Sequence, residues 1–387
     1  MALCVTVTTS YGVLFYAFPV LAPAISTDTG WSLTTVTAWF SGAQVVAGLG
    51  GILVGRWLQG YGPRAVMTVA GVLAVPATVA LAYSPRVEVF ALAWLVAGVA
   101  MAGLFYPPAF AAVTGWFSTH RVRALMVLTL VAGLASTIFA PLTAAFEAMW
   151  GWRGAYLALA GVLAFVVVPL HAFALPRGWE KSGGGGRASA GAAASARTAV
   201  RSRAFWALTV ALAAGSLTVF AVIVNLVPLL DERGFDTTTA AWILGLGGVG
   251  QVLGRLIYPP LERRTTPVTR MVGVLAACAV TTIVLGLVPG PWTLLVVISV
   301  LAGMARGVLT LLQATAVTDR WGTQSYATLN GVMHTPIMVA IALAPWAGAA
   351  LAGPLGGYPA AFTALGALGA LAALISLASR PTPSQSS

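Results

Sequence analysis

Charged side chains are scarce in this chain of 387 residues. They make up 7% of the sequence, whereas hydrophobic residues make up 59%. Soluble globular domains average about 25% charged residues, which they need to cover a water-facing surface. The shortage of charge excludes a water-soluble globular protein and indicates that lipid is the solvent for most of the surface.

Cysteine and histidine are also rare. The two cysteines, Cys4 and Cys278, lie in apolar segments and do not have the spacing of a disulfide or a metal site. A membrane enzyme would need histidines clustered with acidic residues. The three histidines here are far apart along the chain and form no such cluster. We expect no enzymatic activity, no metal and no cofactor. A sensor that keeps a transporter fold would add a signalling domain, for which the predicted helices leave no room.

Long apolar runs fill most of the chain. With no water in the hydrocarbon, backbone groups must bond internally, so only helices or closed barrels cross a bilayer. These runs are continuously apolar over about 20 residues rather than alternating, which indicates helices. We expect an all-α membrane protein with twelve transmembrane helices near 4–25, 33–57, 65–83, 88–115, 124–148, 154–175, 204–230, 237–260, 269–288, 292–318, 325–350 and 359–379.

The two halves of the chain repeat each other at an offset of 204 residues. Ala140-Pro141 returns as Ala344-Pro345, and the segments 30–35 and 234–239 share a Gly and two Thr. The repeat predicts two six-helix bundles, residues 1–176 and 204–387, joined by a basic Gly- and Ala-rich linker at 177–203. A duplicated membrane unit of this kind is typical of proteins that move a solute by alternating access.

The net charge of +11 is a topology signal rather than a nucleic-acid footprint. Fifteen of the 20 Lys and Arg fall in loops assigned to the inside, and three, Arg86, Arg153 and Arg233, fall outside. Positive charge is retained on the cytoplasmic side, so we expect a multi-pass protein of the cell membrane, the inner membrane in a bacterium, with both termini cytoplasmic.

The loop after the second predicted helix carries the first family resemblance. Residues 55–64 read GRWLQGYGPR and resemble the major facilitator superfamily signature Gly-x-Leu-x-Asp-Arg-x-Gly-x-Arg. Gly55, Gly62 and Arg64 match this conformational loop motif, whereas Gln59 stands at its acidic position. The resemblance implies the major facilitator fold, and the loss of the acid argues against a charged latch here.

Further matches resemble the monocarboxylate transporter and oxalate/formate antiporter group. They are found in the first helix and its loop, before the sixth helix, and in the seventh and eighth helices: Tyr11-Gly12, Tyr16-Ala17-Phe18-Pro19, Gly30-Trp31-Ser32, Trp116-Phe117, Gly151-Trp152-Arg153, Leu226-Val227-Pro228 and Gly254-Arg255-Leu256. The resemblance implies that Arg255 occupies the position that binds the substrate carboxylate. The first-helix Lys of the group is Val20 here, and its acid four residues before the arginine is Gln251.

Two arginines, Arg255 and Arg306, fall within predicted spans. A charge at mid-bilayer costs at least about 2.5–3.5 kcal/mol, so each needs a partner or a wet cavity. Neither helix has a carboxylate three or four residues away. A guanidinium can hold a carboxylate with two parallel hydrogen bonds, which predicts an anion site at both arginines. Alternatively, Arg255 bonds backbone carbonyls or a helix end.

The nine Asp and Glu lie at predicted helix ends or in loops, so the candidates for proton coupling are His334 and His171. His334 ranks first because it precedes Thr335-Pro336, where a helix break would expose carbonyls. Alternatively, each imidazole bonds a neighbouring helix.

Tyr16, Tyr106 and Asn225 are the other candidate pocket residues, since they could orient a small polar solute or serve as interhelical hydrogen-bond partners.

Together these features predict a secondary active or facilitative transporter of small organic anions, of monocarboxylate type, that works as a monomer in the lipid bilayer. Exchange and facilitated transport are as compatible with the sequence as proton symport. The alternative within transport is an exporter of drug-like or hydrophobic compounds, which an apolar cavity in a chain with 13 Trp would admit.

Overall fold

The computed structural model describes residues 1–116, 121–176, 197–322 and 326–380. Nearly all of these residues are helical, and none of them lies in a β-strand. The same residues contain ten helical segments that are long and apolar enough to cross a membrane. The all-α membrane fold expected from the sequence is therefore confirmed.

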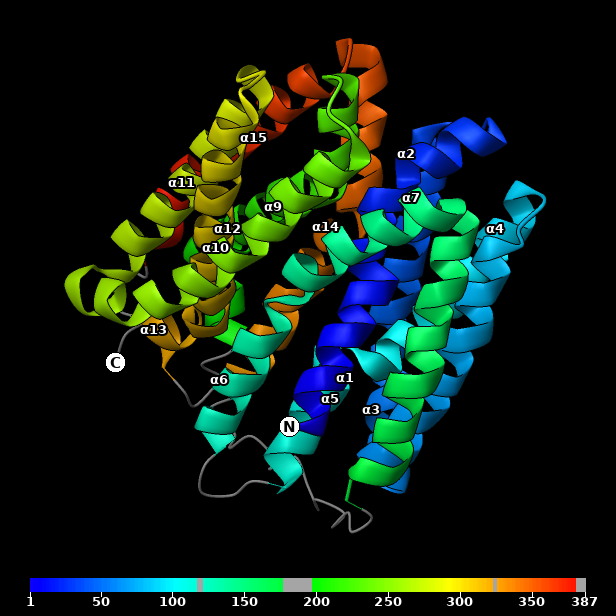
Figure 1. The fold of residues 1–387 in the computed structure, drawn as a ribbon. Helices are drawn as coiled ribbons and strands as arrows, with labels where there is room; N and C mark the ends of the chain where they lie inside the picture. The colour runs from blue at the N-terminus through cyan, green and yellow to red at the C-terminus, as the bar shows by residue number, and fades with distance from the viewer. Residues whose placement is uncertain (117–120, 177–196, 323–325, 381–387) are drawn as a thin grey trace. The chain divides into compact units, whose positions relative to one another are not determined.

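Figure 1 shows the elements in chain order. They are α1 (Ala2–Tyr11), the π-helix η1 (Gly12–Tyr16), α2 (Ala17–Thr29), α3 (Leu33–Ala82), α4 (Val87–Leu104), α5 (Tyr106–Trp116), α6 (Arg121–Ala132), α7 (Ala135–Val162), the π-helices η2 (Leu163–Val167) and η3 (Leu170–Ala174), α9 (Arg203–Glu232), α10 (Thr237–Arg264), α11 (Pro267–Leu287), α12 (Trp292–Thr315), α13 (Thr318–Trp321), α14 (Tyr326–Leu355), α15 (Tyr358–Ser376) and the 3₁₀ turn η4 (Leu377–Ser379).

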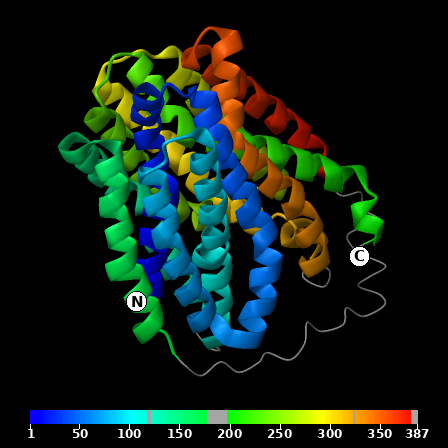
Figure 2. The ribbon, with the colours of Figure 1, turned by 90° about the vertical axis from the view of Figure 1, so that its right-hand side faces the viewer.

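Two long segments each contain two predicted helices. α3 covers the predicted helices 33–57 and 65–83 and turns sharply at Gly62, whose φ of 77° and ψ of 165° are not helical. Figure 2 shows the two arms of α3 in two shades of blue, meeting at this turn. The span Arg123–Ala174 covers 124–148 and 154–175, with a similar turn at Gly151. The helix bounds agree with the sequence, while the count of twelve stays a prediction.

The chain divides into two compact units. The first unit comprises residues 1–183 and 223–248, and the second comprises 184–222 and 249–387, within the described ranges. The predicted linker at 177–203 lies mostly outside the described residues, so the division into halves at that point stays a prediction. Because the boundary crosses α9 and α10, each of these helices contributes residues to both units.

The core of the first unit is aromatic. Phe18 of α2 stacks on Phe40 of α3, with ring centroids 4.1 Å apart, and both rings meet the edge of Trp94 from α4. All three side chains are almost fully buried. Such offset and edge-on contacts add to the packing of large side chains, and they hold α2, α3 and α4 together.

The second unit is held at one end by buried arginines. Arg270 at the start of α11 pairs with Asp319 of α13 and donates to the Glu262 and Thr265 carbonyls. Arg320 donates to the Ser379 carbonyl at 3.1 Å and to the Ser379 hydroxyl at 3.1 Å. These bonds connect α11, α13 and η4, so this end of the unit is fixed by charge-assisted hydrogen bonds.

The internal repeat is visible in the start of two helices. Ser32 caps α3 by accepting a hydrogen bond from the Thr35 amide at 3.1 Å, and Asp236 caps α10 by accepting one from the Thr239 amide at 3.0 Å. Each pair is preceded by a glycine with positive φ, Gly30 or Gly234. The residues that match at an offset of 204 therefore build the same turn and the same N-cap in both halves of the chain.

Asp236 lies outside the membrane spans and gives the α10 cap a pH dependence. Hydrogen bonds from the Thr239 hydroxyl and amide hold the pKa of the Asp236 carboxyl below its usual range. Because the folded pKa is depressed, the carboxylate stabilises the fold above about pH 4 and loses this contribution as pH falls through the folded pKa. We expect Asp236→Ala to cost about 0.5–2 kcal/mol at neutral pH.

The measurement is thermal unfolding of the detergent-solubilised protein at neutral pH and near pH 4. Asp236→Asn is the matched control, because asparagine keeps a capping oxygen and does not ionise. Equal melting temperatures for the alanine variant and the wild type at neutral pH would contradict the assignment of the cap.

Candidate functional site

Buried polar side chains gather on α10 and α12 in the second unit. Arg255 is 5% exposed, Arg306 is 8% exposed and Gln251 is 8% exposed. Arg306 donates from Nη2 to the Gln251 Oε1 atom at 3.2 Å. The predicted site residues Arg255 and Arg306 therefore lie in one unit, and Gln251 links the helices that carry them.

Glycines on both helices set this arrangement. A Cβ atom at Gly250 would lie 2.1 Å from the Val300 carbonyl oxygen, and one at Gly254 would lie 2.1 Å from the Met304 oxygen. On α12, a Cβ atom at Gly307 would lie 2.1 Å from the Gln251 oxygen. Small residues let transmembrane backbones approach closely. The two helices thus touch backbone to backbone beside the arginines.

A second polar bond lies near the end of α12. The Gln313 Nε2 atom donates to the Ser216 hydroxyl of α9 at 2.7 Å. Ser216 is fully buried and also donates to the Leu212 carbonyl. Gln251 and Gln313 are the residues whose specific partners the sequence did not predict. The spacing of Gly250 and Gly254 around Gln251 was the available signal for a close helix contact.

Three other predicted pocket residues belong to the first unit. Tyr16 ends η1 and meets the edge of Phe15 at 5.1 Å, and Tyr106 begins α5 beside Tyr11, 4.8 Å between ring centroids. Asn225 of α9 is fully buried and falls in the part of that helix assigned to the first unit. The structure thus connects Tyr16 and Tyr106 through an aromatic chain and groups Arg255 with Arg306.

The aromatic chain follows two interruptions in helical geometry. η1 is a π-helical turn that separates α1 from α2, and Phe105 separates α4 from α5 with a ψ of −166°. The rings of Tyr11 and Phe105 stack across these two places at 4.0 Å. Single π-turns in helices are frequent at functional sites. The predicted pocket residues Tyr16 and Tyr106 therefore lie where two helices of the first unit depart from regular geometry.

The two candidate histidines have different surroundings. His171 on η3 is fully buried, and its Nδ1 atom lies 3.1 Å from the Met67 carbonyl of α3. His334 on α14 is half-buried and lies one turn after Asn330. Because Pro336 has no N–H, the Val332 carbonyl lacks its usual helical donor next to His334. The sequence left open that each imidazole bonds a neighbouring helix, and His171 has such a bond, to the Met67 carbonyl of α3.

The signature loop contains the Gly62 turn described above. Gly55 lies in the first arm of α3, and Arg64 is half-buried in the second arm, two residues after the turn. The side chain of Gln59 lies outside the described part of the structure. The loop motif therefore corresponds to the bend of α3, and its role in conformational change stays a prediction.

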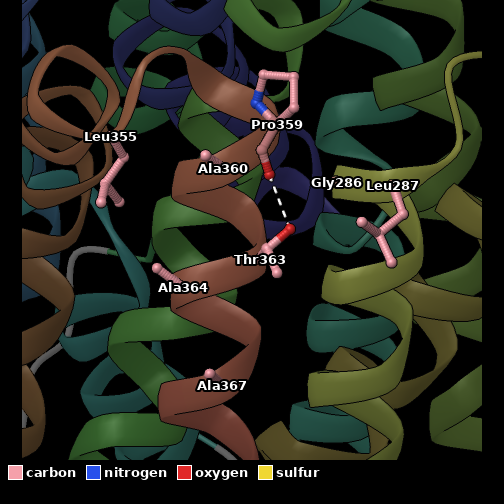
Figure 3. A pocket seen from close by; sticks show the side chains of 8 residues that line it. All are labelled: Gly286, Leu287, Leu355, Pro359, Ala360, Thr363, Ala364 and Ala367. Atoms are coloured by element: carbon pink, nitrogen blue, oxygen red, sulfur yellow. Dashed lines mark hydrogen bonds between the residues drawn. The ribbon is translucent and has the colours of Figure 1, made fainter.

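An apolar groove of about 510 Å³ lies in the second unit, away from the arginines in sequence (Figure 3). It is lined by the ends of α11 and α14 and the start of α15: Gly286, Leu287, Leu355, Pro359, Ala360, Thr363, Ala364 and Ala367. Its hydroxyl, from Thr363, donates to the Pro359 carbonyl at 2.9 Å. With no charged lining group, this groove does not fit a charged solute.

These features define a class of protein. Intramembrane ionisable side chains are costly, and in membrane proteins they mark solute or ion pathways. A helical protein whose described residues form ten candidate spans, with the buried arginines Arg255, Arg270 and Arg306 within them, has the properties of a membrane transporter.

Sequence comparison gives the family. The chain matches the family model described as Major Facilitator Superfamily over residues 3–335, and it belongs to this superfamily of transporters. The expected resemblance to monocarboxylate transporters is also found among curated relatives. The recognition made from the signature loop and the helix motifs is therefore confirmed.

Three relatives show the extent of the similarity. Monocarboxylate transporter 11 of Homo sapiens is 31% identical over 291 residues, which cover 72% of this chain and 59% of the relative. Monocarboxylate transporter 13 of Rattus norvegicus is 26% identical over 264 residues, 68% of this chain and 60% of the relative. An uncharacterized MFS-type transporter, YcxA of Bacillus subtilis, is 29% identical over 137 residues, 34% of this chain and 33% of the relative. The chain thus matches a third to three fifths of the length of these relatives.

Solved structures show the same fold. A bacterial homologue of the human lysosomal transporter Spinster, in an inward-facing and unoccupied conformation, superposes with a TM-score of 0.78 at 16% identity, covering 99% of this chain and 98% of that one. The nucleoside transporter NupG gives a TM-score of 0.75 at 13% identity, covering 97% and 99%. At these identities the likeness concerns the fold alone.

The contact between α10 and α12 gives a prediction on stability. Gly254→Ala places a methyl group against the Met304 carbonyl, and we expect a loss of about 1–3 kcal/mol, as for other overpacked cores. Gly273→Ala on α11 is the matched control, because nothing lies within 4 Å of a Cβ atom there. Thermal unfolding in detergent measures both variants. Equal melting temperatures for Gly254→Ala and Gly273→Ala would contradict the close backbone contact between α10 and α12.

Proposed function

We propose that this chain is a secondary active or facilitative transporter of small organic anions of monocarboxylate type, which works by alternating access. The observation that carries the proposal is the guanidinium of Arg255, which is buried on α10, a membrane-spanning helix. A planar guanidinium binds a carboxylate through two parallel hydrogen bonds, and a low dielectric strengthens such a pair.

The relatives support the class of solute. Two of them are named as monocarboxylate transporters and match about 70% of this chain. Arg255 matches the eighth-helix arginine of that group by resemblance. Val20 and Gln251 replace the lysine and the acid of the same group, so the coupling of transport to protons is not carried over with the arginine. Exchange or facilitated transport fits these replacements equally well.

The setting of the transporter is proposed from the sequence. Two six-helix bundles, residues 1–176 and 204–387, rock about a shared site and are joined by the basic linker at 177–203. The protein lies in the cell membrane as a monomer. Both termini are in the cytoplasm, because the positive charge gathers in the loops assigned to that side. The Gly62 turn and Arg64 shape the loop that follows the second predicted helix.

Uptake of labelled carboxylates tests the proposal. We expect wild-type protein in proteoliposomes to take up short monocarboxylates and Arg255→Gln to lose uptake at least tenfold, because glutamine cannot supply the bidentate, charged grip. Arg263→Gln is the matched control, since Arg263 is exposed near the end of the same helix. We expect the control to transport as the wild type does.

Equal uptake by the wild type and Arg255→Gln would refute the anion site. Resistance of cells to toxic apolar compounds, without carboxylate uptake, would instead establish the exporter function. Size-exclusion chromatography of each variant shows whether a loss of uptake reflects a loss of folded protein.

His334 and His171 lead to different predictions for the pH dependence of uptake. We expect that any dependence of uptake on a pH gradient is lost in His334→Gln and retained in His171→Gln. His171 is fully buried against the Met67 carbonyl, whereas His334 is half-buried beside the Pro336 interruption. Uptake at several imposed gradients measures the dependence. Loss of the dependence in His171→Gln alone would reverse the assignment.

A further inference from the structure

One end of the second unit brings together the start of α9, the start of α11, α13 and η4. Phe205 in the first turn of α9 packs against Trp321 of α13, with ring centroids 5.6 Å apart. Arg320 of α13 donates to the Ser379 carbonyl of η4 at 3.1 Å and to the Pro267 carbonyl of α11 at 3.4 Å. These contacts place four elements that are distant in sequence side by side.

The end of α10 belongs to the same region. Arg270 at the start of α11 donates to the Glu262 carbonyl of α10 at 3.3 Å and pairs with Asp319 of α13. Two helices of this unit therefore start here and one ends here, and α13 and η4 fill the space between them. A single end of the unit thus carries all the surface that the next paragraphs concern.

Exposed arginines flank these helix ends. The set, which we call the arginine surface, has members before and at the start of α9, at the end of α10 and after η4: Arg197, Arg201, Arg203, Arg264 and Arg380. The sequence from 181 to 230 contains no Asp or Glu, so the three arginines at α9 have no acidic neighbour along the chain. The surface is therefore strongly positive.

Exposed apolar side chains beside these arginines mark the boundary of the hydrocarbon. Trp206, three residues after Arg203, is 47% exposed, and Leu377, three residues before Arg380, is 49% exposed. Tryptophan is enriched where a transmembrane helix crosses the interface between hydrocarbon and headgroups. Three residues of α-helix cover about 4.5 Å, so Arg203 lies one step outside this interface, at the level of the lipid phosphates.

The energetics of the helix itself do not account for the arginines at α9. A helix N-terminus carries a partial positive charge, and basic residues next to it are unfavourable. The Phe205 amide in this first turn already donates to the Ser202 hydroxyl at 3.2 Å. Arg264 differs, since a basic residue at the end of α10 is favourable for that helix. The α9 arginines therefore need a source of negative charge outside the helix.

We propose that the arginine surface binds the headgroups of anionic phospholipids in the leaflet that this end of the unit faces. Clusters of basic residues beside a transmembrane helix attract an anionic leaflet, and guanidinium groups form paired hydrogen bonds with phosphate oxygens. The partner is a lipid rather than a soluble anion because Trp206 and Leu377 place the arginines where phosphates of the bilayer already lie. This surface is independent of the solute site.

Phosphatidylglycerol and phosphatidylcholine with identical acyl chains are the matched probes, because both have a phosphate diester and choline cancels its charge. Native mass spectrometry of the purified full-length protein in an uncharged detergent counts the lipid bound at each lipid concentration and gives an apparent dissociation constant. We expect phosphatidylglycerol to bind the wild type at least tenfold more tightly, and we expect added salt to reduce the difference.

Variants locate the binding. A basic residue near an anionic surface strengthens attraction about fivefold, so the triple variant Arg201→Gln, Arg203→Gln and Arg264→Gln should lose at least tenfold in affinity for phosphatidylglycerol. The same three positions changed to lysine keep their charge and should bind within about threefold of the wild type. Phosphatidylcholine binding should be the same in all of them.

A pair of single variants provides the matched control. Arg203 begins α9, and Arg86 is an exposed arginine that immediately precedes α4 in the first unit. Both changes to glutamine remove one charge beside the start of a membrane-spanning helix. We expect Arg203→Gln to weaken phosphatidylglycerol binding about fivefold and Arg86→Gln to leave it unchanged. Thermal unfolding in detergent identifies any variant that has lost its fold, and the single variants decide the test if the triple variant is unstable.

Three results would overturn the inference. The first is equal affinity of the wild type for the two lipids. The second is an equal loss in Arg203→Gln and Arg86→Gln, which would show that only the total charge of the protein matters. The third is displacement of phosphatidylglycerol by an equal concentration of glycerol 3-phosphate, which has the anionic group without acyl chains and would assign the surface to soluble anions. Carboxylate uptake tests the proposed function separately.

Discussion

The hydrocarbon interior of the bilayer is the constraint on which this structure depends. It offers no water to backbone groups or to charges, so the described part of the chain is almost entirely helical and its acidic side chains lie at or near helix ends or turns. Asp28 near the end of α2 pairs with Arg153, two residues after the Gly151 turn of α7, and Arg270 of α11 pairs with Asp319 of α13. A guanidinium within a membrane span costs free energy, and packing alone does not offset that cost.

Glycine then determines where those arginines lie. Gly250, Gly254 and Gly307 bring α10 and α12 to backbone contact, and this contact joins Arg306 to Gln251. In the first unit the packing is different, because large rings such as Phe18, Phe40 and Trp94 fill the space between helices. The duplicated halves therefore share their caps and turns but not their cores.

At four positions where the resembled motifs carry a charge, this chain has an uncharged residue. Gln59 and Gly60 replace the acid and the arginine of the signature loop, Val20 replaces a lysine, and Gln251 replaces an acid. Each replacement removes a charge that could pair with another. The arginine of the eighth predicted helix remains, and a second arginine on α12 now bonds the neutral residue at the former acidic position. The chain thus belongs to its superfamily and has uncharged residues at these motif positions in both units.

The sequence by itself determined the helical class, the helix bounds to within a few residues and the superfamily, because hydropathy and glycine turns act locally. It also singled out Arg255 and Arg306 as site candidates, through the cost of a charge within a span. It also contained the repeat between residues 30–35 and 234–239, in which Ser32 and Asp236 are N-caps. Only the tertiary structure decided that Arg306 bonds Gln251, that His171 packs on the Met67 carbonyl and that Tyr106 stacks in a chain with Tyr11. These contacts join residues 55 to 104 positions apart. They depend on which helix faces meet, and neither period nor composition within one helix specifies that choice.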